Sequence, residues 1–594
     1  MGPIAARASR LAGLLLFAVF PTTHLAAQAD VTGQWTTLLT SMPINPVHVA
    51  MLHNGKILVV SGSGNVPNNP NYQAGIFDPA TGQVTTQPVS WDMFCNGMAI
   101  LPDGRPLIAG GTLQYDPFHG EAHAAVFNPG TNVFSNVQSM AVGRWYPTST
   151  VMGDGREMLF SGLDVNGGTT PAVQFFTAAT GWSAPVNAPW IPPLYPRMTL
   201  LPNGSVFYSG PGANSALFDP SAQTWALNVA QTNYGGYRGY GTTVLLPLTP
   251  ANSYAPHVMI LGGSNPSTAT TEIIDMSQLV PAWSFGPNMS QPRIEMNATI
   301  LPSGKVLALG GSLNDEDNNT ASLNADLYDP GANTFSSAGA NSFPRLYHSV
   351  SLLLPDATVW IAGGNPTRGF FQSQMEIYQP AYLFTRDGQG HVILATRPTI
   401  KTAPTTATYG STFLVNTPDA NSISSIALVR AGADTHAFDM DQRMIGLSFT
   451  NQGNGKLLVN APANGNLAPP GYYMLFLVNS SGVPSLAKWV QMRPQGTFQL
   501  PISPSSNTVT RSSTSTYTVA VTALSGFQST VSLIARGPNA HITASVNPSV
   551  IGPSGTSTLT VTVDAKATPG VYTVPVIGAS AQLTATGKLT LTVQ

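Results

Sequence analysis

The chain has 594 residues, of which 43% are hydrophobic and only 8% are charged. This apolar fraction is ample for packed cores and excludes a globally disordered chain, while 57 Gly and 50 Pro favour a protein of many turns and strands. The net charge of −2 and the absence of a long basic run exclude the electrostatic surface with which proteins bind nucleic acids or anionic membranes.

Residues 1–29 are typical of an export signal. Arg7 and Arg10 precede an apolar stretch at residues 11–20, and small residues close the segment. No later apolar run approaches the roughly 20 residues that a membrane-spanning helix needs. We therefore expect an exported protein without a membrane span, extracellular or periplasmic, whose mature chain begins near Asp30.

One pattern recurs seven times between residues 51 and 365. Each copy has an apolar strand, a turn such as Pro-Asp-Gly, and a second apolar strand that ends in Gly-Gly or Ser-Gly, which predicts an antiparallel hairpin. The closing glycines are residues 62, 110, 162, 210, 262, 310 and 363, so the period is 48 to 53 residues. A period near 50 with a Gly pair is typical of kelch repeats, whose four-stranded blades close radially. A solenoid is the alternative, but it would need polar capping repeats.

The sequence thus predicts an all-β chain that begins with a seven-bladed kelch-type β-propeller over residues 30–384. A strand around Trp35 is expected to complete the last blade. Residues 397–495 and 500–594 carry short apolar strands between Pro and Gly turns, which predicts two immunoglobulin-like β-sandwich domains. The last domain is rich in Ser and Thr and carries no catalytic pattern.

Seven positions at equal offset in the repeats form a predicted ring. They lie six residues before the Leu or Met that opens each turn, where the innermost strand enters the propeller, so we expect them at equal height around its axis. Their occupants are Pro46, Cys95, Tyr146, Tyr195, Tyr240, Glu295 and His348. Packing alone would favour small or aliphatic residues here. The polar occupants therefore indicate a functional site.

Three arginines are expected in one layer beside this ring, because they stand two positions before ring residues and a strand repeats every two. They are Arg144, Arg238 and Arg293. One interpretation is a partly cationic funnel that binds substrate together with Tyr195, Tyr240 and Glu295. The other, of equal weight, is that the guanidinium groups satisfy loop carbonyls.

Cys95 is the only cysteine of a chain that we expect in an oxidising compartment, where thiols usually pair. It is either a small buried hydrophobic residue or a chemically committed sulfur. Imidazole and phenol groups near a thiol suit copper(II) better than zinc, for which no Cys-x-x-Cys or His-Glu-x-x-His pattern exists. Tyr347 and the adjacent His348 can share one centre only if the strand bends between them.

The remaining motifs give no support for another metal, cofactor or catalytic site. His119 and His123 flank Glu121, but a helix is improbable there, and we expect loop residues. No glycine-rich nucleotide motif and no Gly-x-Ser-x-Gly elbow gives support for a nucleotide cofactor or a serine hydrolase.

Four separated motifs resemble the copper-radical oxidases, the family that includes galactose oxidase and glyoxal oxidase. They are WDMFCNG (91–97), GRWYPT (143–148), FPRLYHSVSLLLPD (343–356) and THAFDMDQR (435–443). The resemblance spans roughly residues 30–495 and is closer to the glyoxal oxidase branch.

The resemblance implies one copper ion and a tyrosyl radical on Tyr146, whose ring is joined to the sulfur of Cys95 by a thioether bond. It also implies Tyr347 as axial phenolate, with His348 and His436 as nitrogen ligands, so that a loop of the first sandwich reaches the propeller axis. The implied reaction oxidises a primary alcohol or an aldehyde and reduces O2 to hydrogen peroxide. The arginine layer favours a carbonyl- or carboxylate-bearing substrate.

Two features depart from galactose oxidase. Asp164 stands near the place of a tryptophan that stacks on the modified tyrosine, and Trp145 is only a sequence neighbour of Tyr146. The last sandwich lies outside the resemblance and is a candidate for contact with glycans or a cell surface. The alternative functions are a noncatalytic propeller that binds a glycan or a protein, and a copper protein that lacks turnover.

Overall fold

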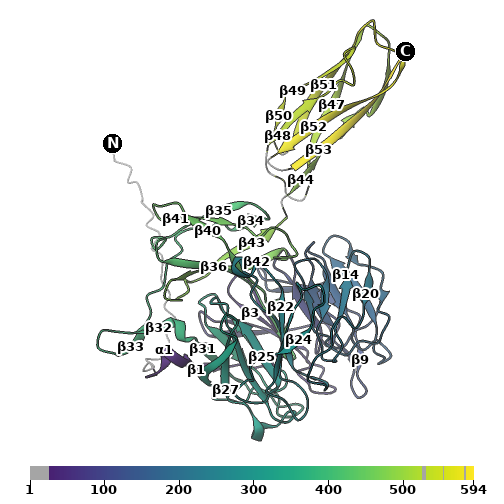
Figure 1. Cartoon of the computed structure of the whole chain (residues 1–594). Helices are drawn as coiled ribbons and strands as arrows, with labels where there is room; N and C mark the ends of the chain where they lie inside the picture. Colours follow the sequence, from purple (N-terminus) through teal and green to yellow (C-terminus); the bar gives the residue numbers. More distant parts are fainter. Residues whose placement is uncertain (1–25, 495, 525–526, 528–529, 553, 581–582) are drawn as a thin grey trace, which may run out of the picture. The chain divides into compact units, whose positions relative to one another are not determined.

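The computed structural model describes residues 26–594 except 495, 525–526, 528–529, 553 and 581–582. The chain divides into one unit that ends at Arg493 and a second unit, Pro494–Gln594 (Figure 1). Almost all of the predicted export signal lies outside the described residues. Within them, no helix has the length and apolar character to cross a membrane.

The first unit contains seven antiparallel sheets, each with four strands in the order of the chain from the axis to the rim, except where stated. Blade 1 contains β2 (His48–Met51), β3 (Ile57–Gly62), β4 (Gln73–Asp78) and β5 (Gln83–Pro88), and blade 2 contains β6 (Gly97–Ile100), β7 (Pro106–Ala109), β10 (Ala124–Asn128) and β11 (Val133–Asn136). Blade 3 contains β12 (Thr148–Val151), β13 (Glu157–Phe160), β14 (Ala172–Thr177), β15 (Gly181–Trp182) and the extra β16 (Val186–Asn187). Blade 4 contains β17 (Met198–Leu200), β18 (Val206–Tyr208), β19 (Ala216–Asp219) and β20 (Thr224–Ala226). A small hairpin, β8 (Thr112–Gln114) and β9 (His119–Gly120), extends from blade 2.

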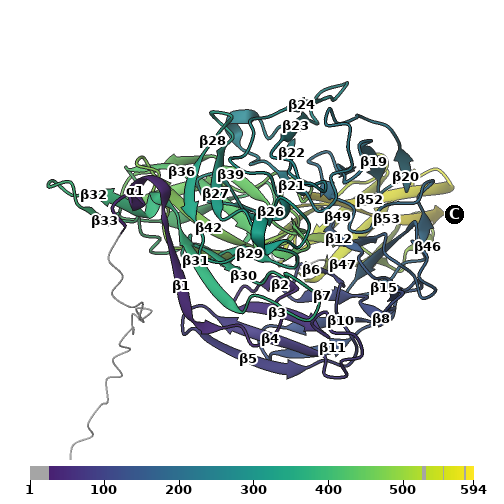
Figure 2. The ribbon, with the colours of Figure 1, turned by 90° about the horizontal axis from the view of Figure 1, so that it is seen from below.

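Blades 5 to 7 follow the same plan. Blade 5 contains β21 (Thr242–Leu245), β22 (His257–Leu261), β23 (Thr271–Asp275) and β24 (Trp283–Phe285). Blade 6 contains β25 (Ile294–Ile300), β26 (Val306–Ser312), β27 (Asn324–Asp329) and β28 (Thr334–Ala340). Blade 7 contains β29 (Val350–Leu353), β30 (Val359–Ala362), β31 (Gln374–Gln379) and β1 (Gln34–Ser41). The first strand of the propeller in the sequence, β1, pairs with β31, the last strand of the seventh repeat. It therefore completes the last blade, as expected (Figure 2). The predicted all-β class and propeller are confirmed.

A few short helical and hairpin segments lie before, within and after these sheets. The helix α1 (Ala29–Thr32) precedes β1, and three 3-10 turns lie at Pro250–Asn252, Asn318–Thr320 and Ala381–Leu383. The hairpin of β32 (Phe384–Arg386) and β33 (Val392–Leu394) leaves the last blade.

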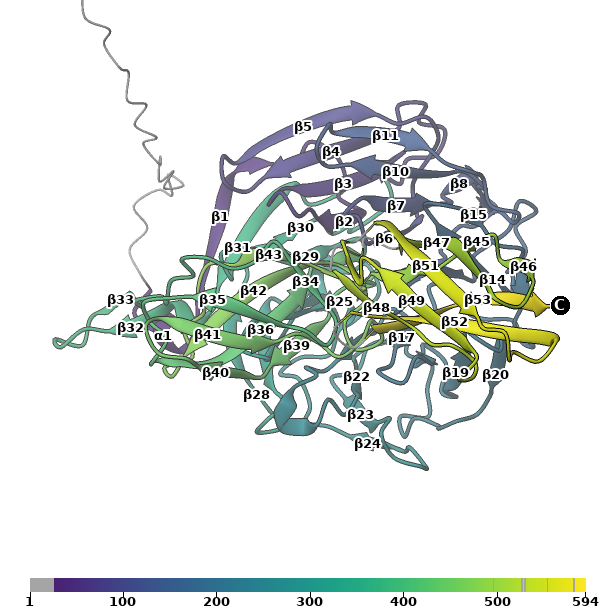
Figure 3. The same cartoon turned by 90° about the horizontal axis from the view of Figure 1, so that it is seen from above.

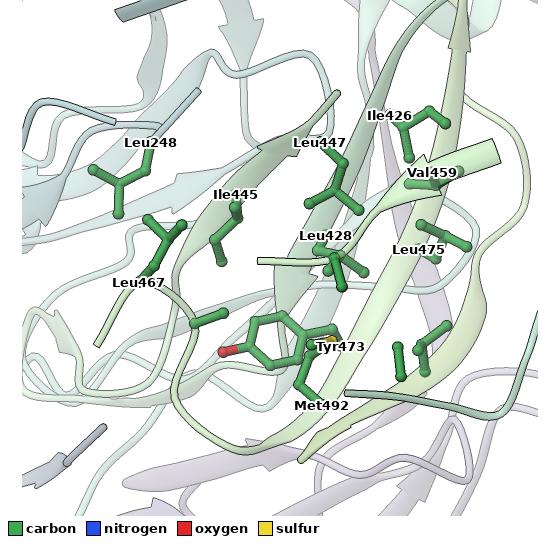
Figure 4. Close-up of a cluster of buried hydrophobic side chains, with 14 of the residues drawn as sticks. Leu248, Ile426, Leu428, Ile445, Leu447, Val459, Leu467, Tyr473, Leu475 and Met492 are labelled. Carbon is green, nitrogen blue, oxygen red and sulfur yellow. The ribbon is translucent and has the colours of Figure 1, made fainter. Parts of the chain in front are cut away.

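A two-sheet sandwich follows (Figure 3). One sheet has the order β34 (Thr406–Thr408), β43 (Lys488–Arg493), β42 (Gly471–Asn479), β36 (Ile423–Arg430) and β39 (Met444–Leu447), and the other has β35 (Thr412–Asn416), β41 (Lys456–Asn460) and β40 (Phe449–Asn451). Its apolar core includes Leu428, Ile445 and Leu475 (Figure 4).

The propeller has two functionally different ends, because its strands alternate in direction. The turn end carries the hairpin turns between the first and second strands of each blade. The ring end carries the connections between blades and the loops between second and third strands. The sandwich packs on the turn end, where Gln491 donates to the Pro102 carbonyl at 2.8 Å and Ala487 N donates to the Pro355 carbonyl at 2.8 Å.

The longer turn of the fifth repeat has a reason in this packing. Leu248, in that turn, is fully buried in the sandwich core beside Ile445 (Figure 4). Its backbone N–H donates to the Met444 carbonyl at 3.0 Å, and its carbonyl accepts from Gly446 N at 2.8 Å. The departure from the repeat pattern therefore anchors one domain to the other.

The second unit is a separate sandwich of two five-stranded sheets with its own core. One sheet contains β44 (Thr497–Gln499), β47 (Ser513–Leu524), β51 (Gly555–Val563), β49 (Ile542–Asn547) and β45 (Ile502–Ser503). The other contains β46 (Ser506–Val509), β53 (Leu583–Val593), β52 (Gly570–Ser580), β48 (Val531–Ala535) and β50 (Val550–Ile551).

Candidate metal centre

The predicted ring has a backbone signature that the sequence did not reveal. Six of its seven residues adopt positive φ, between 43° and 66°: Cys95, Tyr146, Tyr195, Tyr240, Glu295 and His348. Only Pro46 does not, because its own ring fixes φ near −65°. A left-handed conformation costs a non-glycine residue about 1–2 kcal/mol, so this repetition is sustained by its surroundings.

Hydrogen bonds between neighbouring blades supply part of that support. Tyr146 N donates to the Cys95 carbonyl at 2.9 Å, and Tyr195 N donates to the Tyr146 carbonyl at 2.9 Å. On the other side of the ring, Glu295 N donates to the Tyr240 carbonyl at 2.9 Å. These three bonds link the turns of consecutive blades and hold the joined ring residues at one level.

His436 enters this ring from the sandwich domain. It lies between β37 (Ala433–Thr435) and β38 (Phe438–Asp439), and β37 extends blade 1 by pairing with β2. His436 Nε2 is 2.9 Å from His348 Nε2 and 3.6 Å from Cys95 Sγ. Among the described residues, these three form the one group of His, Cys and acidic side chains with metal-ligand spacing, their ligand atoms lying within 4.8 Å of one another.

Hydrogen bonds at Nδ1 determine which nitrogen of His348 and of His436 carries the proton. Thr435 Oγ1 donates to the Val47 carbonyl at 2.8 Å, so it accepts from His436 Nδ1 at 2.5 Å. Asn365 Oδ1 accepts from His348 Nδ1 at 2.7 Å, and the Asn365 amide donates to the Phe370 carbonyl, which fixes its orientation. Both Nε2 atoms therefore carry a lone pair, and two lone pairs only 2.9 Å apart form an arrangement that a shared cation would stabilise.

Burial keeps these imidazoles uncharged. It lowers the pKa of His348 to about 3 and that of His436 well below its usual value, with His348 as a further cause for His436. Metal ions bind neutral imidazole, so these two histidines need lose no proton at neutral pH. The donor set of two imidazoles, phenols and a sulfur fits copper.

Buried polar contacts fix the hairpin that carries His436. Arg197 Nη2 donates to the His436 carbonyl at 3.1 Å and also to the Gly241 carbonyl at 2.8 Å. Asp434 accepts from Ser351 N at 2.7 Å, across the axis from blade 7. His436 itself has φ of 49°, the same conformation as the ring residues.

Tyr347 and His348 share the centre because the chain bends at His348, where φ is 60°. Their rings stack at 3.8 Å, and each contacts the His436 ring edge to face, at 5.3 Å and 4.5 Å respectively. Burial raises the pKa of the Tyr347 phenol well above its usual value, with the Cys95 thiol as second cause. Tyr347 keeps some solvent exposure, whereas Cys95 and His348 have almost none.

A tryptophan covers Tyr146 although Asp164 stands at the expected place. The Trp145 and Tyr146 rings stack at 3.6 Å with 7° between their planes, and Phe118 stacks on the far side of Trp145 at 4.2 Å. Asp164 instead accepts from Asn166 N at 2.8 Å in a surface turn. Adjacent residues can stack here because Tyr146 has left-handed φ, which turns its side chain back over its neighbour.

The candidate substrate residues separate into two groups. Tyr195 is buried beneath Tyr146 and His436, with both ring contacts at 4.5 Å, and its hydroxyl donates to the Asn96 carbonyl. Tyr240 is partly exposed and contacts Tyr347 edge to face at 5.4 Å.

The three arginines of the predicted layer lie inside the blades. Arg144 donates to the Ser161 and Ala172 carbonyls, Arg238 pairs with Glu272 at 3.1 Å, and Arg293 pairs with Asp326 at 2.8 Å. Each is at most 5% exposed. Of the two interpretations weighed from the sequence, these contacts favour the one in which guanidinium groups satisfy carbonyls and carboxylates. A funnel that binds substrate through them is not supported.

Several positioning residues escaped sequence reasoning. Arg345 repeats the pattern in blade 7, paired with Glu376 at 2.7 Å, but stands three positions before its ring residue. Thr435 lies in a motif of the resemblance and Asn365 lies outside the four motifs, and nothing in the spacing of either residue reveals contact with His436 or His348. His119 and His123 stay apart from the centre, donating to the Val165 carbonyl and pairing with Glu121 respectively.

Comparisons with known proteins agree with this geometry. The family model described as "Glyoxal oxidase N-terminus" matches residues 68–382, and the model "Galactose oxidase-like, Early set domain" matches residues 397–492. The aldehyde oxidase GLOX of Vitis pseudoreticulata is 27% identical over 541 residues, covering 79% of this chain and 99% of its own. The galactose oxidase of Gibberella zeae is 27% identical over 515 residues, covering 80% and 72%.

A solved structure shares the fold. It is a fungal alcohol oxidase of the AA5 family in complex with copper, with a TM-score of 0.68 and 24% identity, and the match covers 78% of this chain and 99% of that one. Because the first family model spans more than half of the 594 residues, the chain belongs to the glyoxal oxidase family of copper-radical oxidases.

Proposed function

We propose that this protein is an exported copper-radical oxidase that converts a small aldehyde or primary alcohol with O2 to the oxidised product and hydrogen peroxide. The observation that carries the proposal is the meeting of His348, His436 and Cys95, from two domains, with the two histidine Nε2 atoms 2.9 Å apart. The relatives named as aldehyde and galactose oxidases support the same chemistry.

Copper would be held by His348, His436, Tyr146 and Tyr347. When bound, it and an oxidised Tyr146 joined to Cys95 would together accept two electrons from the substrate and pass them to O2. The backbone contact between Tyr146 N and the Cys95 carbonyl supports a bond between their side chains, because it makes them neighbours on the ring.

The surrounding residues prepare the reaction. Tyr347 is partly exposed next to both histidines, so its phenol oxygen is placed to accept a proton from a substrate hydroxyl. Trp145 and Phe118 cover the Tyr146 ring and keep water from it. Tyr240 and Glu295 are proposed to contact the substrate on the opposite side, whereas Tyr195 is assigned a packing role.

Peptide mapping of copper-loaded protein tests the thioether directly. We expect a linked fragment containing Cys95 and Tyr146 that lacks two hydrogen atoms, and its absence in the Cys95→Ala variant. Cys95→Ala should remain folded but lose nearly all peroxide production. Unchanged turnover in this variant would contradict the proposed cofactor.

The same assay separates the alternative functions. A noncatalytic propeller would bind no copper at this site and form no linked fragment. A copper protein without turnover would form both and still release no peroxide. Export stays a prediction from residues 1–29, and the contact of the second unit with a glycan or cell surface also stays a prediction.

A further inference from the structure

The loops around the proposed active site carry charges of one sign. Between the second and third strands of the seven blades, the ring end has six acidic residues: Asp116, Glu121, Asp164, Asp315, Glu316 and Asp317. All six reach solvent to some degree. The same loops carry one arginine, Arg368, the two histidines His119 and His123, and no lysine.

Arg368 offsets only part of this charge, because it is paired with Asp116 and only opposes the rise in the pKa of Glu316 that burial and Asp315 cause. Its Nη1 lies 2.7 Å from Asp116 Oδ2, and its guanidinium lies 5.5 Å from the centre of the Phe118 ring. The blade connections at this end add arginines, but these are buried against carbonyls or paired with carboxylates, as described above. Asp315 and Glu316 have no ion-pair partner within the part of the chain that the structure describes.

Two of these acids extend to the ring itself. Glu316 N donates to Glu295 Oε2 at 3.3 Å, and Glu295 occupies the same left-handed ring position as Cys95 and His348. Glu295 N in turn donates to the Tyr240 carbonyl at 2.9 Å, which links the acidic turn to Tyr240. Since Tyr240 contacts Tyr347, the acidic turn at residues 313–320 lies against the substrate side of the centre.

We propose that Asp315 and Glu316 select the charge of the substrate: the site favours uncharged and cationic aldehydes or alcohols and disfavours carboxylates. This inference rests on the proposed function and names its substrate class. Loops that carry one sign of charge concentrate ions of the opposite sign near them and repel those of their own sign. It also reverses the expectation of a carboxylate-bearing substrate, which depended on arginines that face the blade interiors.

Three primary alcohols of matched size provide the first test: glycolate, ethylene glycol and ethanolamine, with glyoxylate and glycolaldehyde as the aldehyde pair. In copper-loaded wild-type protein at low salt, kcat/KM should rise from the anionic to the cationic compound. Asp315→Asn/Glu316→Gln should raise the anionic-to-uncharged ratio by about threefold to tenfold. The difference should shrink near 0.5 M salt, where screening shortens the range of charge.

Asp219→Asn is a control for position, because it removes one charge from an exposed turn at the opposite end of the propeller. It should leave the ratio as in the wild type. If the double variant leaves the ratio unchanged while the wild type oxidises these compounds, the inference is overturned and the proposed function stands. If the wild type oxidises none of the alcohols or aldehydes, the proposed function fails instead.

A second measurement needs no turnover. The rate at which copper-free protein takes up Cu²⁺ should fall about threefold to tenfold in Asp315→Asn/Glu316→Gln, relative to Asp219→Asn, and the gap should close at high salt. Equal uptake rates would show that the acidic loops do not act on the centre, whatever the assay with alcohols gives.

Discussion

The two ends of the propeller use the same repeat for opposite purposes. At the turn end, several charges are balanced by near neighbours, as in the Lys56–Asp78 and Lys305–Asp329 pairs at 3.4 Å and 3.0 Å. At the ring end, six successive blades hold a residue in a left-handed conformation, and the loops carry unbalanced acids. The comparison shows that the regular repeats form a rigid scaffold. The energetically costly left-handed conformations of the ring residues lie at the end of the propeller that holds the site.

The largest effect is expected from removing a histidine of the ring end. His436→Ala should abolish copper binding and lower peroxide production by roughly a thousandfold or more, because the ligand set loses one of two imidazoles. Copper content and oxidase assays measure this. His391→Ala, at an exposed hairpin residue, is the control and should change neither. Copper binding retained by His436→Ala would show that the centre is not assembled across two domains.

The buried arginines sharpen the comparison in stability. Arg345 and Glu376 are fully buried 2.7 Å apart, so Arg345→Met leaves an unpaired carboxylate and should cost about 3–5 kcal/mol of unfolding free energy. Arg105→Met, at an exposed pair of the turn end, should cost less than about 1 kcal/mol. Denaturant unfolding compares the two. Equal losses would contradict a structural role specific to the ring end.

A change at Thr435 tests whether its hydrogen bond to His436 supports copper binding. Thr435→Val removes the acceptor of His436 Nδ1 and should weaken copper binding about tenfold to a hundredfold, as loss of a ligand's hydrogen-bond partner usually does. Thr435→Ser should restore most of the affinity. Competition with a chelator measures both, and an equal effect of Val and Ser would argue against the hydrogen bond.

Trp145 tests the aromatic cover of Tyr146. Stacked aromatic pairs contribute about 0.5–1.5 kcal/mol, so Trp145→Leu should shorten the lifetime of oxidised Tyr146 by roughly twofold to twelvefold. Optical decay of the oxidised protein measures this. Asp164→Asn, at the position where a tryptophan was expected, should leave the lifetime unchanged.

The smallest effect is expected outside the propeller. A chain ended at Arg493 keeps every residue of the centre and should retain copper content and kcat/KM within about twofold, because the second unit has its own core. Loss of activity in a soluble, folded truncated protein would show that the second unit takes part in the reaction.

The sequence by itself determined the repeat, and with it the blades, because a hairpin turn and a closing glycine leave a local pattern at each copy. It also singled out the ring, since equal offsets in equal repeats must lie at equal height. His436 and the thioether pair came from the resemblance rather than from spacing, because residues 341 positions apart carry no local signal of contact.

Only the tertiary structure decided which way those side chains face. The arginines at residues 144, 238 and 293 share a layer by periodicity, yet buried carbonyls and carboxylates draw them into the blades, since an unpaired guanidinium there would be too costly. Left-handed φ at Tyr146 and His348 sets Trp145 over its neighbour and Tyr347 beside His436. Backbone dihedrals of this kind arise from contacts between blades, so no stretch of sequence contains them.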